Sequence, residues 1–341
     1  MTPDQITSGW LSSVLGTDVD LAGSTRIGDG LVGMNLRLQL RSAQAPSTLI
    51  AKLPTLDPTS RATATALRNY EREVKFYEQI APTVDIRVAH CHHAEWHADT
   101  DDFVLLLEDL SPGEQGNQLL GCSAEHSRVA VLELARLHGP RWGDPTLHDV
   151  EFLRRNGPED AAALETFWDL LVPGFLGTYS QYLDSEGVAL IERFSARLTD
   201  WVLGHTLPAT VTHGDYRLDN LMFQSSAGGY PVAAVDWQTP GHGPASGDVA
   251  YFLGAGPLPH VRREIERGLV DDYCAALDAY GVTVDGDEFW QQFCRDAYSG
   301  IIMAVIASQV VGESERSEAM FAAMATRHIR HALDVGAEGL I

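Results

Sequence analysis

Residues 211–223 read VTHGDYRLDNLMF, and this stretch governs the interpretation of the whole chain. Apolar residues at both ends are typical of short buried strands, whereas the segment between them carries a histidine, two aspartates and an asparagine. A second stretch, VAAVDWQ at 232–238, likewise ends an apolar run with an aspartate, Asp236. Polar groups that follow neighbouring strands can meet, so we expect the two stretches to form one site.

The spacing within the first stretch indicates a particular chemistry. Asp215 and Asn220 stand five positions apart, as do the base and the metal ligand in the H-R-D-x-x-x-x-N loop of phosphoryl-transfer enzymes. In that loop the carboxylate accepts the proton of the attacking hydroxyl, while the amide oxygen holds Mg²⁺. Asp236 could supply a second carboxylate to the metal. An isolated aspartate is more often a cap or turn residue, so only the combination carries the interpretation.

The N-terminal part contains a glycine-rich stretch. Residues 28–33 read GDGLVG, a G-x-G-x-x-G pattern made by Gly28, Gly30 and Gly33. The pattern occurs in dinucleotide-binding folds and in kinases, but the former need a helix after the glycines. Here the alternating sequence MNLRLQL at 34–40 predicts a strand. We therefore predict a glycine hairpin whose amides approach phosphates; a turn without a ligand is the alternative.

Lysine occurs only twice in the chain, and Lys52 lies inside the apolar strand predicted at 47–53. A buried ammonium group needs a charged partner, although a lysine that reaches the surface is the alternative. The helix predicted at 59–80 offers Glu71 and Glu73. Glu73 lies nearer the apolar face, so we predict that it pairs with Lys52, with Glu71 as the second choice. That apolar face is formed by Leu67, Tyr70, Val74, Tyr77 and Ile80.

The order of patterns along the chain predicts an α+β fold with two lobes. Residues 1–110 would form a small, β-rich N-terminal lobe, and residues 111–341 a larger, mostly helical lobe with a strand-containing island at 208–238. The strands of the first lobe are expected at 34–40, 47–53 and 103–110. The helices of the second are expected at 123–138, 159–182, 186–203, 259–281, 286–310 and 315–334.

Composition narrows the class of protein. The chain has 341 residues, 45% of them hydrophobic, which suits a globular protein with a real core. Its formal net charge of −23 argues against nucleic acid and anionic membrane surfaces as partners. No stretch has the length of a transmembrane helix, and the N-terminus lacks the features of a secretory signal, so we expect a cytoplasmic protein. Four scattered cysteines indicate neither disulfides nor a zinc site.

Together these motifs carry a family resemblance. HGDYRLDN followed by VDWQTPGHGPASGDVAYFLG resembles the aminoglycoside phosphotransferase and choline kinase family, which has a bilobal protein-kinase-like fold. The resemblance covers nearly the whole chain. Many antibiotic-modifying members have HGDLHPGN instead. The form found here, with GLVGMN, EREVKFYE and LARLHGPRW, is closer to the branch of ecdysteroid-kinase-like proteins and kinase-like domains associated with acyl-CoA dehydrogenases.

The resemblance implies roles in the second lobe. Asp215 would be the catalytic base, and Asn220 and Asp236 would bind Mg²⁺. His213 would support the catalytic loop, and Asp248 would brace it from the following helix, outside the chemistry. As a hypothesis, Arg217 could bring a cation to the transferring phosphoryl group.

The resemblance also implies an ATP site in the first lobe. Lys52, paired with Glu73, would hold the α- and β-phosphates under the glycine hairpin. The stretch FVLLLEDL at 103–110 would supply the adenine-binding connector near Glu108 to Leu110. The expected activity is ATP- and Mg²⁺-dependent transfer of a phosphoryl group to a hydroxyl of a small molecule.

Other readings stay open at this point. A nucleotide-binding pseudokinase or scaffold would keep the same motifs without turnover. A nicotinamide-dependent oxidoreductase would need a helix after Gly33. A protein kinase would need activation-segment landmarks that are absent from the sequence. The run HCHHAEWH at 90–97 could suggest a metal site, but in a strand its histidines would point to opposite faces. Neither the acceptor nor the oligomeric state can be read from the sequence.

Overall fold

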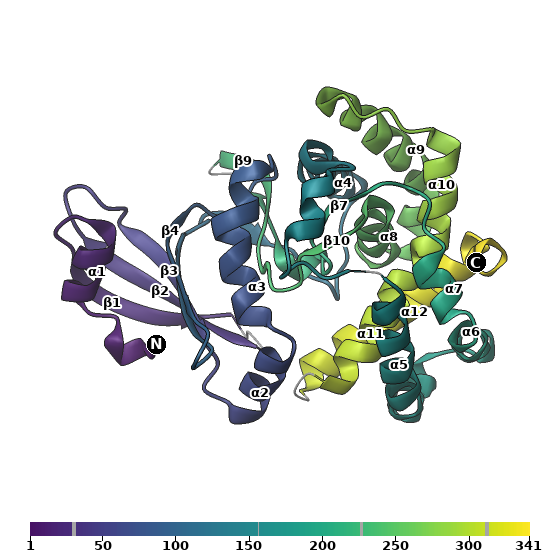
Figure 1. The fold of residues 1–341 in the computed structure, drawn as a ribbon, viewed down its shortest axis with the longest axis horizontal. Helices are drawn as coiled ribbons and strands as arrows, with labels where there is room; N and C mark the ends of the chain where they lie inside the picture. Colours follow the sequence, from purple (N-terminus) through teal and green to yellow (C-terminus); the bar gives the residue numbers. More distant parts are fainter. Residues whose placement is uncertain (29–31, 156, 226–227, 311–313) are drawn as a thin grey trace.

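The computed structural model describes residues 1–28, 32–155, 157–225, 228–310 and 314–341. It has a β-rich N-terminal lobe and a mostly helical C-terminal lobe (Figure 1). The prediction of a bilobal α+β fold is therefore confirmed. Because the last strand of the N-terminal sheet ends at Glu108, we propose that the lobes divide at residue 110.

The N-terminal lobe is built on an antiparallel sheet with the strand order β1-β2-β3-β5-β4. Both faces of the sheet are covered. Val104 and Leu106 of β5 pack in the cluster that includes Leu11 of α1, whereas Phe103 and Leu105 pack in the cluster of α3. Strands buried on both faces read as continuous apolar runs, as β5 does. The elements are α1 (Ser8–Leu15), β1 (Asp20–Ile27), β2 (Gly33–Arg41), β3 (Thr48–Pro54), α2 (Pro58–Ala66), α3 (Asn69–Lys75), β4 (Cys91–His97) and β5 (Asp102–Glu108).

The prediction of a single helix at 59–80 is wrong. The chain forms α2, then α3, then a π-helical turn, η2 (Phe76–Ile80). Arg68 interrupts the helix because it has a left-handed conformation, with φ of 56°. Leu67, expected on the apolar face, is 41% exposed, since the buried face starts only at Tyr70.

The second lobe contains the expected helices, but several are divided. The helix predicted at 186–203 is divided into α6 and α7. The helix predicted at 286–310 is divided into α10 and α11 at the buried Asp296, which contacts His205 and Ser246. The helix α8, which carries Asp248, was not among those predicted from periodicity. The helices are α4 (Ala124–His138), α5 (Pro158–Tyr179), α6 (Ser185–Ser195), α7 (Leu198–Leu203), α8 (Ala245–Ala255), α9 (Pro259–Leu277), α10 (Gly286–Arg295), α11 (Ser299–Val310) and α12 (Glu315–Asp334).

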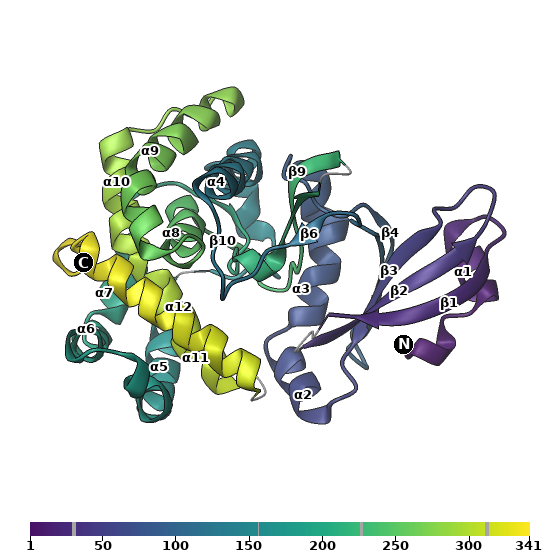
Figure 2. The ribbon, with the colours of Figure 1, turned by 180° about the vertical axis from the view of Figure 1, so that it is seen from behind.

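Two small sheets form the island at 208–238 and its surroundings. One pairs β7 (Ala209–Thr212) with β10 (Gly241–Pro244), and the other has the order β6-β8-β9. Figure 2 labels β6, β9 and β10 in this region. The segments 213–220 and 235–240 thus each connect one sheet to the other. The remaining strands are β6 (Glu114–Gln115), β8 (Leu221–Ser225) and β9 (Gly228–Ala234). The short helical turns are η1 (Pro3–Gln5), η3 (Ala81–Thr83), η4 (Gly139–Arg141), η5 (Pro145–Asp149), η6 (Ser180–Tyr182), η7 (Leu218–Asn220), η8 (Asp278–Tyr280), η9 (Asp296–Tyr298) and η10 (Ala337–Leu340).

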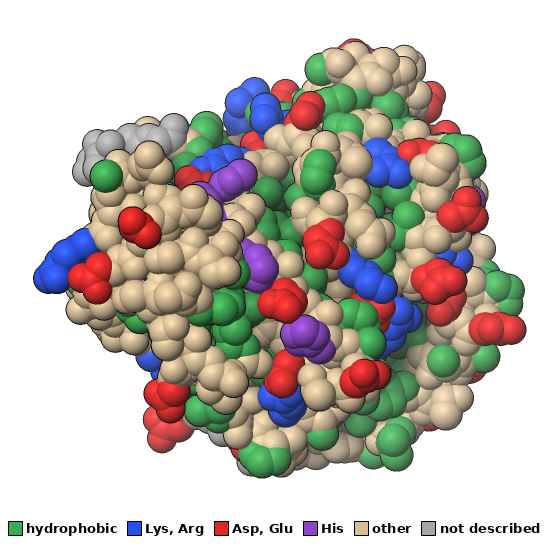
Figure 3. All heavy atoms as spheres, turned by 60° about the vertical axis from the view of Figure 1, so that its left-hand side comes forward, with side chains coloured by type: hydrophobic (Ala, Val, Ile, Leu, Met, Phe, Trp, Pro, Cys, Tyr) green, Lys and Arg blue, Asp and Glu red, His purple; other side chains and the backbone are tan. Residues whose placement is uncertain are grey.

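A shared core joins the lobes. The largest cluster of buried side chains includes Tyr70 of α3, Phe103 of β5, Val131 of α4 and Phe252 of α8. On the face shown in Figure 3, acidic side chains are spread among basic ones. None of the described helices has the length and apolar character needed to span a membrane.

Candidate active site

The segment 213–220, between β7 and β8, is anchored by α8. The Asp248 carboxylate accepts hydrogen bonds from the backbone N–H groups of His213 at 2.7 Å and Gly214 at 3.0 Å. Burial would raise the pKa of Asp248, but its contact with His138 and the bond from His213 hold the pKa below its usual value. Asp248 therefore stays charged and fixes the start of the loop.

The loop at 213–220 approaches the segment 235–240 closely at Gly214. This glycine has φ of 77°, and a Cβ atom there would lie 2.4 Å from the carbonyl oxygen of Thr239. Only glycine fits such a backbone conformation and such a close approach. The His213 ring adds a second link, because its Nε2 donates to the carbonyl oxygen of Val235 at 3.1 Å. The loop at 213–220 is thereby packed directly against the segment that carries Asp236.

The Asp215 carboxylate receives hydrogen bonds from three side chains. Tyr251 donates its hydroxyl to Oδ1 at 2.7 Å, Asn220 donates Nδ2 to Oδ2 at 2.9 Å, and Arg217 donates Nε to Oδ2 at 3.3 Å. Asn220 also donates to the backbone carbonyl of Asp215 at 2.9 Å, which closes the turn between the two residues. The five-residue spacing thus brings the two side chains into contact.

Tyr251 was missed by the sequence reasoning. Its hydroxyl stays protonated, because burial and the negative charge of Asp215 raise its pKa well above the ordinary value. It lies three residues after Asp248 on α8, a spacing that puts both side chains on one helix face. That spacing, in GDVAYFLG, is the signal that could have identified it.

Lys52 stands between two carboxylates. Its Nζ lies 2.7 Å from Glu73 Oε1 and 2.8 Å from Asp236 Oδ1, and its side chain is 8% exposed. Burial disfavours the ammonium ion, yet the charges of Asp236 and Glu73 raise the pKa of Lys52 above its usual value. Burial would likewise raise the pKa of Asp236, but Lys52 holds it below its usual value. Glu71, the second choice, pairs instead with Arg68 and Lys75.

Gly33, the last glycine of the GDGLVG stretch, lies next to this lysine. A Cβ atom on Gly33 would be 3.4 Å from Cε of Lys52, so the start of β2 runs against the lysine side chain. Gly28 has a left-handed φ of 66°, which glycine adopts without strain. Gly30 lies outside the described residues. Because the strand β2 begins at Gly33, the helix required by a dinucleotide fold is not found there.

Glu108 and Leu110 make their own contacts, with residues other than Lys52, Asp236 and Asp215. Glu108 pairs with Arg87 at 2.6 Å, and the Leu110 carbonyl accepts a hydrogen bond from Tyr230 at 2.6 Å. A hollow of about 360 Å³ adjoins them. It is lined by Arg87, Glu108, Asp109, Leu110, Ser111, Pro112 and Tyr230.

Asp219, which had no predicted role, holds two guanidinium groups. Its Oδ2 lies 2.8 Å from Arg217 Nη1 and 3.1 Å from Arg316 Nη2. Oδ1 accepts the backbone N–H of Gln118 at 2.9 Å. Burial opposes the charge of Arg217, but Asp215 and Asp219 raise its pKa above the usual value. Arg217 is therefore a fixed cation beside Asp215, and it links the loop to α12 through Asp219 and Arg316.

The model of the phosphotransferase enzyme family matches residues 35–285, a range that includes Lys52, Asp236 and the loop at 213–220. The chain belongs to this family. No curated protein has significant sequence similarity to this phosphotransferase.

Solved structures share its fold at low sequence identity. Choline kinase from Cryptosporidium parvum Iowa II is 12% identical, with a TM-score of 0.58 over 94% of this chain and 91% of that one. An ethanolamine kinase from Plasmodium vivax is 8% identical, with a TM-score of 0.54 over 94% and 84% of the two chains. The ADP-bound aminoglycoside phosphotransferase APH(2'')-Ib is 12% identical, with a TM-score of 0.53 over 94% and 97%. These likenesses confirm the protein-kinase-like fold of this phosphotransferase.

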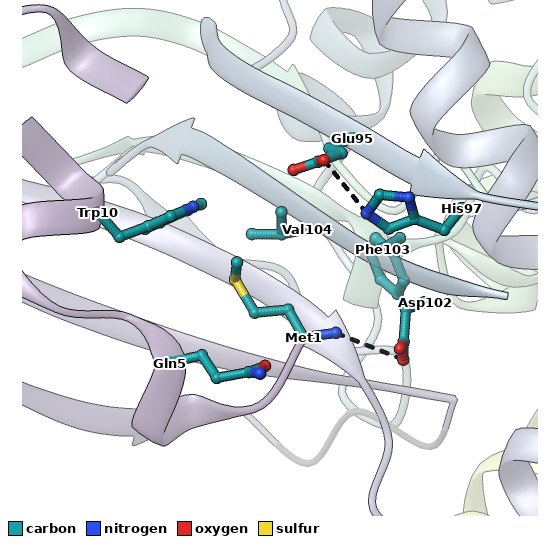
Figure 4. Close-up of a pocket in the computed structure, with 8 residues that line it drawn as sticks. All are labelled: Met1, Gln5, Trp10, Glu95, His97, Asp102, Phe103 and Val104. Carbon is teal, nitrogen blue, oxygen red and sulfur yellow. Dashed lines mark ion pairs between the residues drawn. The ribbon is translucent and has the colours of Figure 1, made fainter. Parts of the chain in front are cut away.

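The histidine run lies elsewhere, on β4. Glu95 lies between His93 and His97, at 3.4 and 3.1 Å. Among the described residues, no cluster of three or more His, Cys, Asp or Glu side chains could hold a metal ion. A hollow of about 390 Å³ lies beside this strand, and none of the predicted site residues lines it. Figure 4 shows the residues that do. The hollow is lined by Met1, Gln5, Trp10, Glu95, His97, Asp102, Phe103 and Val104.

Proposed function

We propose that this phosphotransferase is a kinase that transfers the γ-phosphoryl group of ATP, with Mg²⁺, to a hydroxyl group of a small molecule. The observation that carries the proposal is the contact of Asp215 with Asn220 in one loop, packed against the Lys52–Asp236 pair. Phosphoryl transfer depends mainly on positioning and on fixed charges, and this arrangement supplies both. A pseudokinase has no use for the complete set of Lys52, Asp215, Asn220 and Asp236.

Asp215 is the residue that would accept the proton of the acceptor hydroxyl. Tyr251 and Asn220 fix the direction of its two oxygens, so little rearrangement is needed when the acceptor arrives. Since Tyr251 already donates to Oδ1, an incoming hydroxyl would share or replace that hydrogen bond. Arg217 would keep positive charge beside the carboxylate while the proton moves.

The residues present fit Mg²⁺. Asn220 binds Asp215 through its nitrogen, and Asp236 binds Lys52 through Oδ1. Among the described residues, no hydrogen bond occupies Asn220 Oδ1 or Asp236 Oδ2. Mg²⁺ prefers such oxygen ligands and usually takes only one or two from the protein, with the rest from water and phosphates. When bound, the ion would neutralise charge on the phosphates during transfer.

Nucleotide binding is assigned to the first lobe. Lys52 carries a positive charge at the edge of the glycine hairpin, where Gly33 lets the backbone come close. We assign the adenine to the connector near Glu108 to Leu110. ADP is bound in the structure of APH(2'')-Ib and GDP in a kanamycin complex of APH(2")-IIIa, so both ATP and GTP need testing here.

The test is an ADP- and GDP-release assay across small alcohols, from aminoglycosides and choline to sugars and hydroxyacyl thioesters. We expect nucleotide release that depends on an alcohol and stops when EDTA removes Mg²⁺. ATP binding without release of ADP in the presence of any alcohol would favour the alternative, a nucleotide-binding pseudokinase or scaffold. Release that persists in excess EDTA would contradict the metal assignment.

A further inference from the structure

Arg154 is distinguished by its lack of a partner. Of all lysine and arginine side chains in the part of the chain that the structure describes, only Arg26 and Arg154 have no hydrogen bond or ion pair. Arg26 lies exposed on β1, at the edge of the N-terminal sheet. Arg154 lies in the stretch between η5 and α5, beside the active site. In a chain with a net charge of −23, an unpaired cation at that place calls for an explanation.

The backbone of Arg154 is held firmly, although its side chain is free. Its N–H donates to the carbonyl oxygen of Pro240 at 3.1 Å, and its carbonyl accepts the N–H of His242 at 2.7 Å. These bonds attach it to the start of β10, directly after the segment that carries Asp236. An exposed guanidinium on a fixed backbone is preorganised to bind a ligand.

Backbone pairing places Arg154 near the catalytic loop. Gly241 pairs with Arg154 on one side and, on the other, with Thr212, which lies three residues before Asp215. Surrounding protein lowers the pKa of Arg154, while the charges of Asp160 and Asp215 raise it. Burial, and then the positive charge of Arg154, lower the pKa of Arg72 to about 10. Two guanidinium groups thus lie close enough to repel one another, and Arg72 donates to carbonyl oxygens at Phe152 and Leu67 rather than to a carboxylate. Such a region favours an anion.

The charges that act on Arg154 differ from those that act on Asp236. Its interacting carboxylates are Asp215 and Asp160, the latter at the start of α5. The cations that act on Asp236 are instead Lys52 and Arg217. Arg154 is therefore associated with Asp215 rather than with the Lys52–Asp236 pair.

We propose that Arg154 determines acceptor specificity by binding an anionic group, so that the natural acceptor is an alcohol that also carries a carboxylate or a phosphate. The planar guanidinium presents two parallel N–H donors that match either oxyanion. The acidic surface of the protein repels anions in general, so a local cation is needed to hold one here. This inference rests on the proposed kinase function and adds the class of acceptor to it.

The test compares matched pairs of alcohols in the ADP-release assay. The anionic members are glycerate, 3-hydroxybutyrate and glycerol 3-phosphate, and the neutral members are glyceramide, 3-hydroxybutyramide and glycerol. We expect turnover to favour anionic members, with the carboxylate and phosphate arms showing which oxyanion is preferred. Arg154→Gln should raise KM for the anionic acceptor by about 10- to 100-fold, more than it lowers kcat, because a charge-assisted hydrogen bond is lost. Arg26→Gln, which removes the other unpaired guanidinium, is the matched control and should leave KM unchanged.

Two kinetic outcomes would overturn the inference while leaving the kinase function intact. One is equal or better turnover of neutral or cationic alcohols, with no effect of Arg154→Gln on KM. The other is a fall in kcat at constant KM, which would indicate that Arg154 acts on the phosphoryl group and not on the acceptor. If no alcohol is turned over, the melting temperature of the protein with ADP and Mg²⁺ is measured with each probe. The anionic probes should raise the melting temperature of the wild type but not that of Arg154→Gln. If no anionic probe raises it, the inference is overturned. Failure to bind ATP at all would instead contradict the proposed function.

Discussion

At the scale of single residues, the Asp215 carboxylate depends on its donors. Tyr251, Asn220 and Arg217 reach it from α8 and from its own loop, so both oxygens are fixed in direction. If Asp215 is the base, as proposed, it can accept a proton only from a hydroxyl that arrives in the correct position. On this proposal Tyr251 is a positioning residue, which acts through Asp215.

Tyr251→Phe tests this role. Loss of the 2.7 Å hydrogen bond frees one carboxylate oxygen to rotate, and we expect kcat to fall by about tenfold, as for loss of one hydrogen bond of about 1.4 kcal/mol. KM for ATP should not change, because Tyr251 does not contact Lys52 or Asp236. Steady-state kinetics provide the measurement, and Tyr182→Phe, at an exposed tyrosine bonded to Glu318, is the control. An unaltered kcat would show that Tyr251 does not position Asp215.

Lys52→Met tests the buried ion pairs. The variant leaves Glu73, whose side chain is 1% exposed, without its cation, so we expect a loss of stability on the order of 3 kcal/mol in urea unfolding. ATP binding should also be lost. Adding Glu73→Gln to Lys52→Met should recover most of the stability but none of the ATP binding. If the double variant regained ATP affinity, Lys52 would not be a phosphate ligand.

Some of these residues could be predicted from the sequence, and others could not. Lys52 and Asp236 stand out because each is a charge in an apolar run, and the pairing with Glu73 follows from the need to neutralise the lysine. Tyr251 and Arg154 do not stand out. A tyrosine in an apolar helix and an arginine in a loop are ordinary, and their significance comes from tertiary contacts.

At the scale of elements, the catalytic loop depends on the conformation of Gly214. Its positive φ and the nearby Thr239 carbonyl both exclude a side chain. Gly214→Ala should therefore displace the loop, abolish transfer and cost more than about 2 kcal/mol of stability.

Gly281→Ala is the matched control for this variant. It also has a left-handed φ, of 70°, but a Cβ atom there would have no neighbour within 4 Å. We expect about 1 kcal/mol of destabilisation and unchanged activity. Both stabilities follow from urea unfolding. If the two variants behaved alike, the close approach of the two segments would have no functional role.

Elements were predicted well where the pattern was long and strongly periodic. The final helix, α12, has the same bounds as expected, 315–334. The break between α2 and α3 escaped prediction because it contains neither glycine nor proline, and Arg68 adopts its left-handed conformation while its side chain binds Glu71. The division of 286–310 similarly reflects the burial of Asp296, a tertiary contact that periodicity does not encode.

At the scale of the whole molecule, buried histidines couple stability to pH. His328 lies on α12 with its ring stacked on Tyr251, and a Cβ atom on Gly254 or Gly300 would overlap it. Neither ring nitrogen has a hydrogen-bond partner among the described residues. Burial, together with the charges of Arg327 and Arg262, lowers the pKa of His328 to about 3. His328 is therefore neutral in the folded protein.

We predict that stability falls as the pH drops below about 6.5, the ordinary pKa of histidine. In that range the unfolded chain binds a proton that folded His328 does not, so the free energy of unfolding should decrease by up to about 1.4 kcal/mol per pH unit for this residue. Urea unfolding between pH 5 and 8 measures the slope. His328→Gln should reduce it, with the exposed His260→Gln as the control. A slope unchanged by His328→Gln would contradict the assignment.

The bilobal architecture was predictable as a whole, because the family resemblance extended over nearly the entire chain. The acceptor region was not. The proposed acceptor residue, Arg154, lies in the stretch before α5, and Arg316 of α12 pairs with Asp219 of the loop; these segments are far apart in the sequence.

The most direct test of the central claim is single-turnover transfer of the γ-phosphoryl group from labelled ATP by wild-type protein and Asp215→Asn. The account predicts that the asparagine variant still binds ATP and Mg²⁺ but transfers at least about 100-fold more slowly, because the base is lost. Asp99→Asn, at an exposed turn, should transfer at the wild-type rate. Transfer by Asp215→Asn at the wild-type rate would contradict the account.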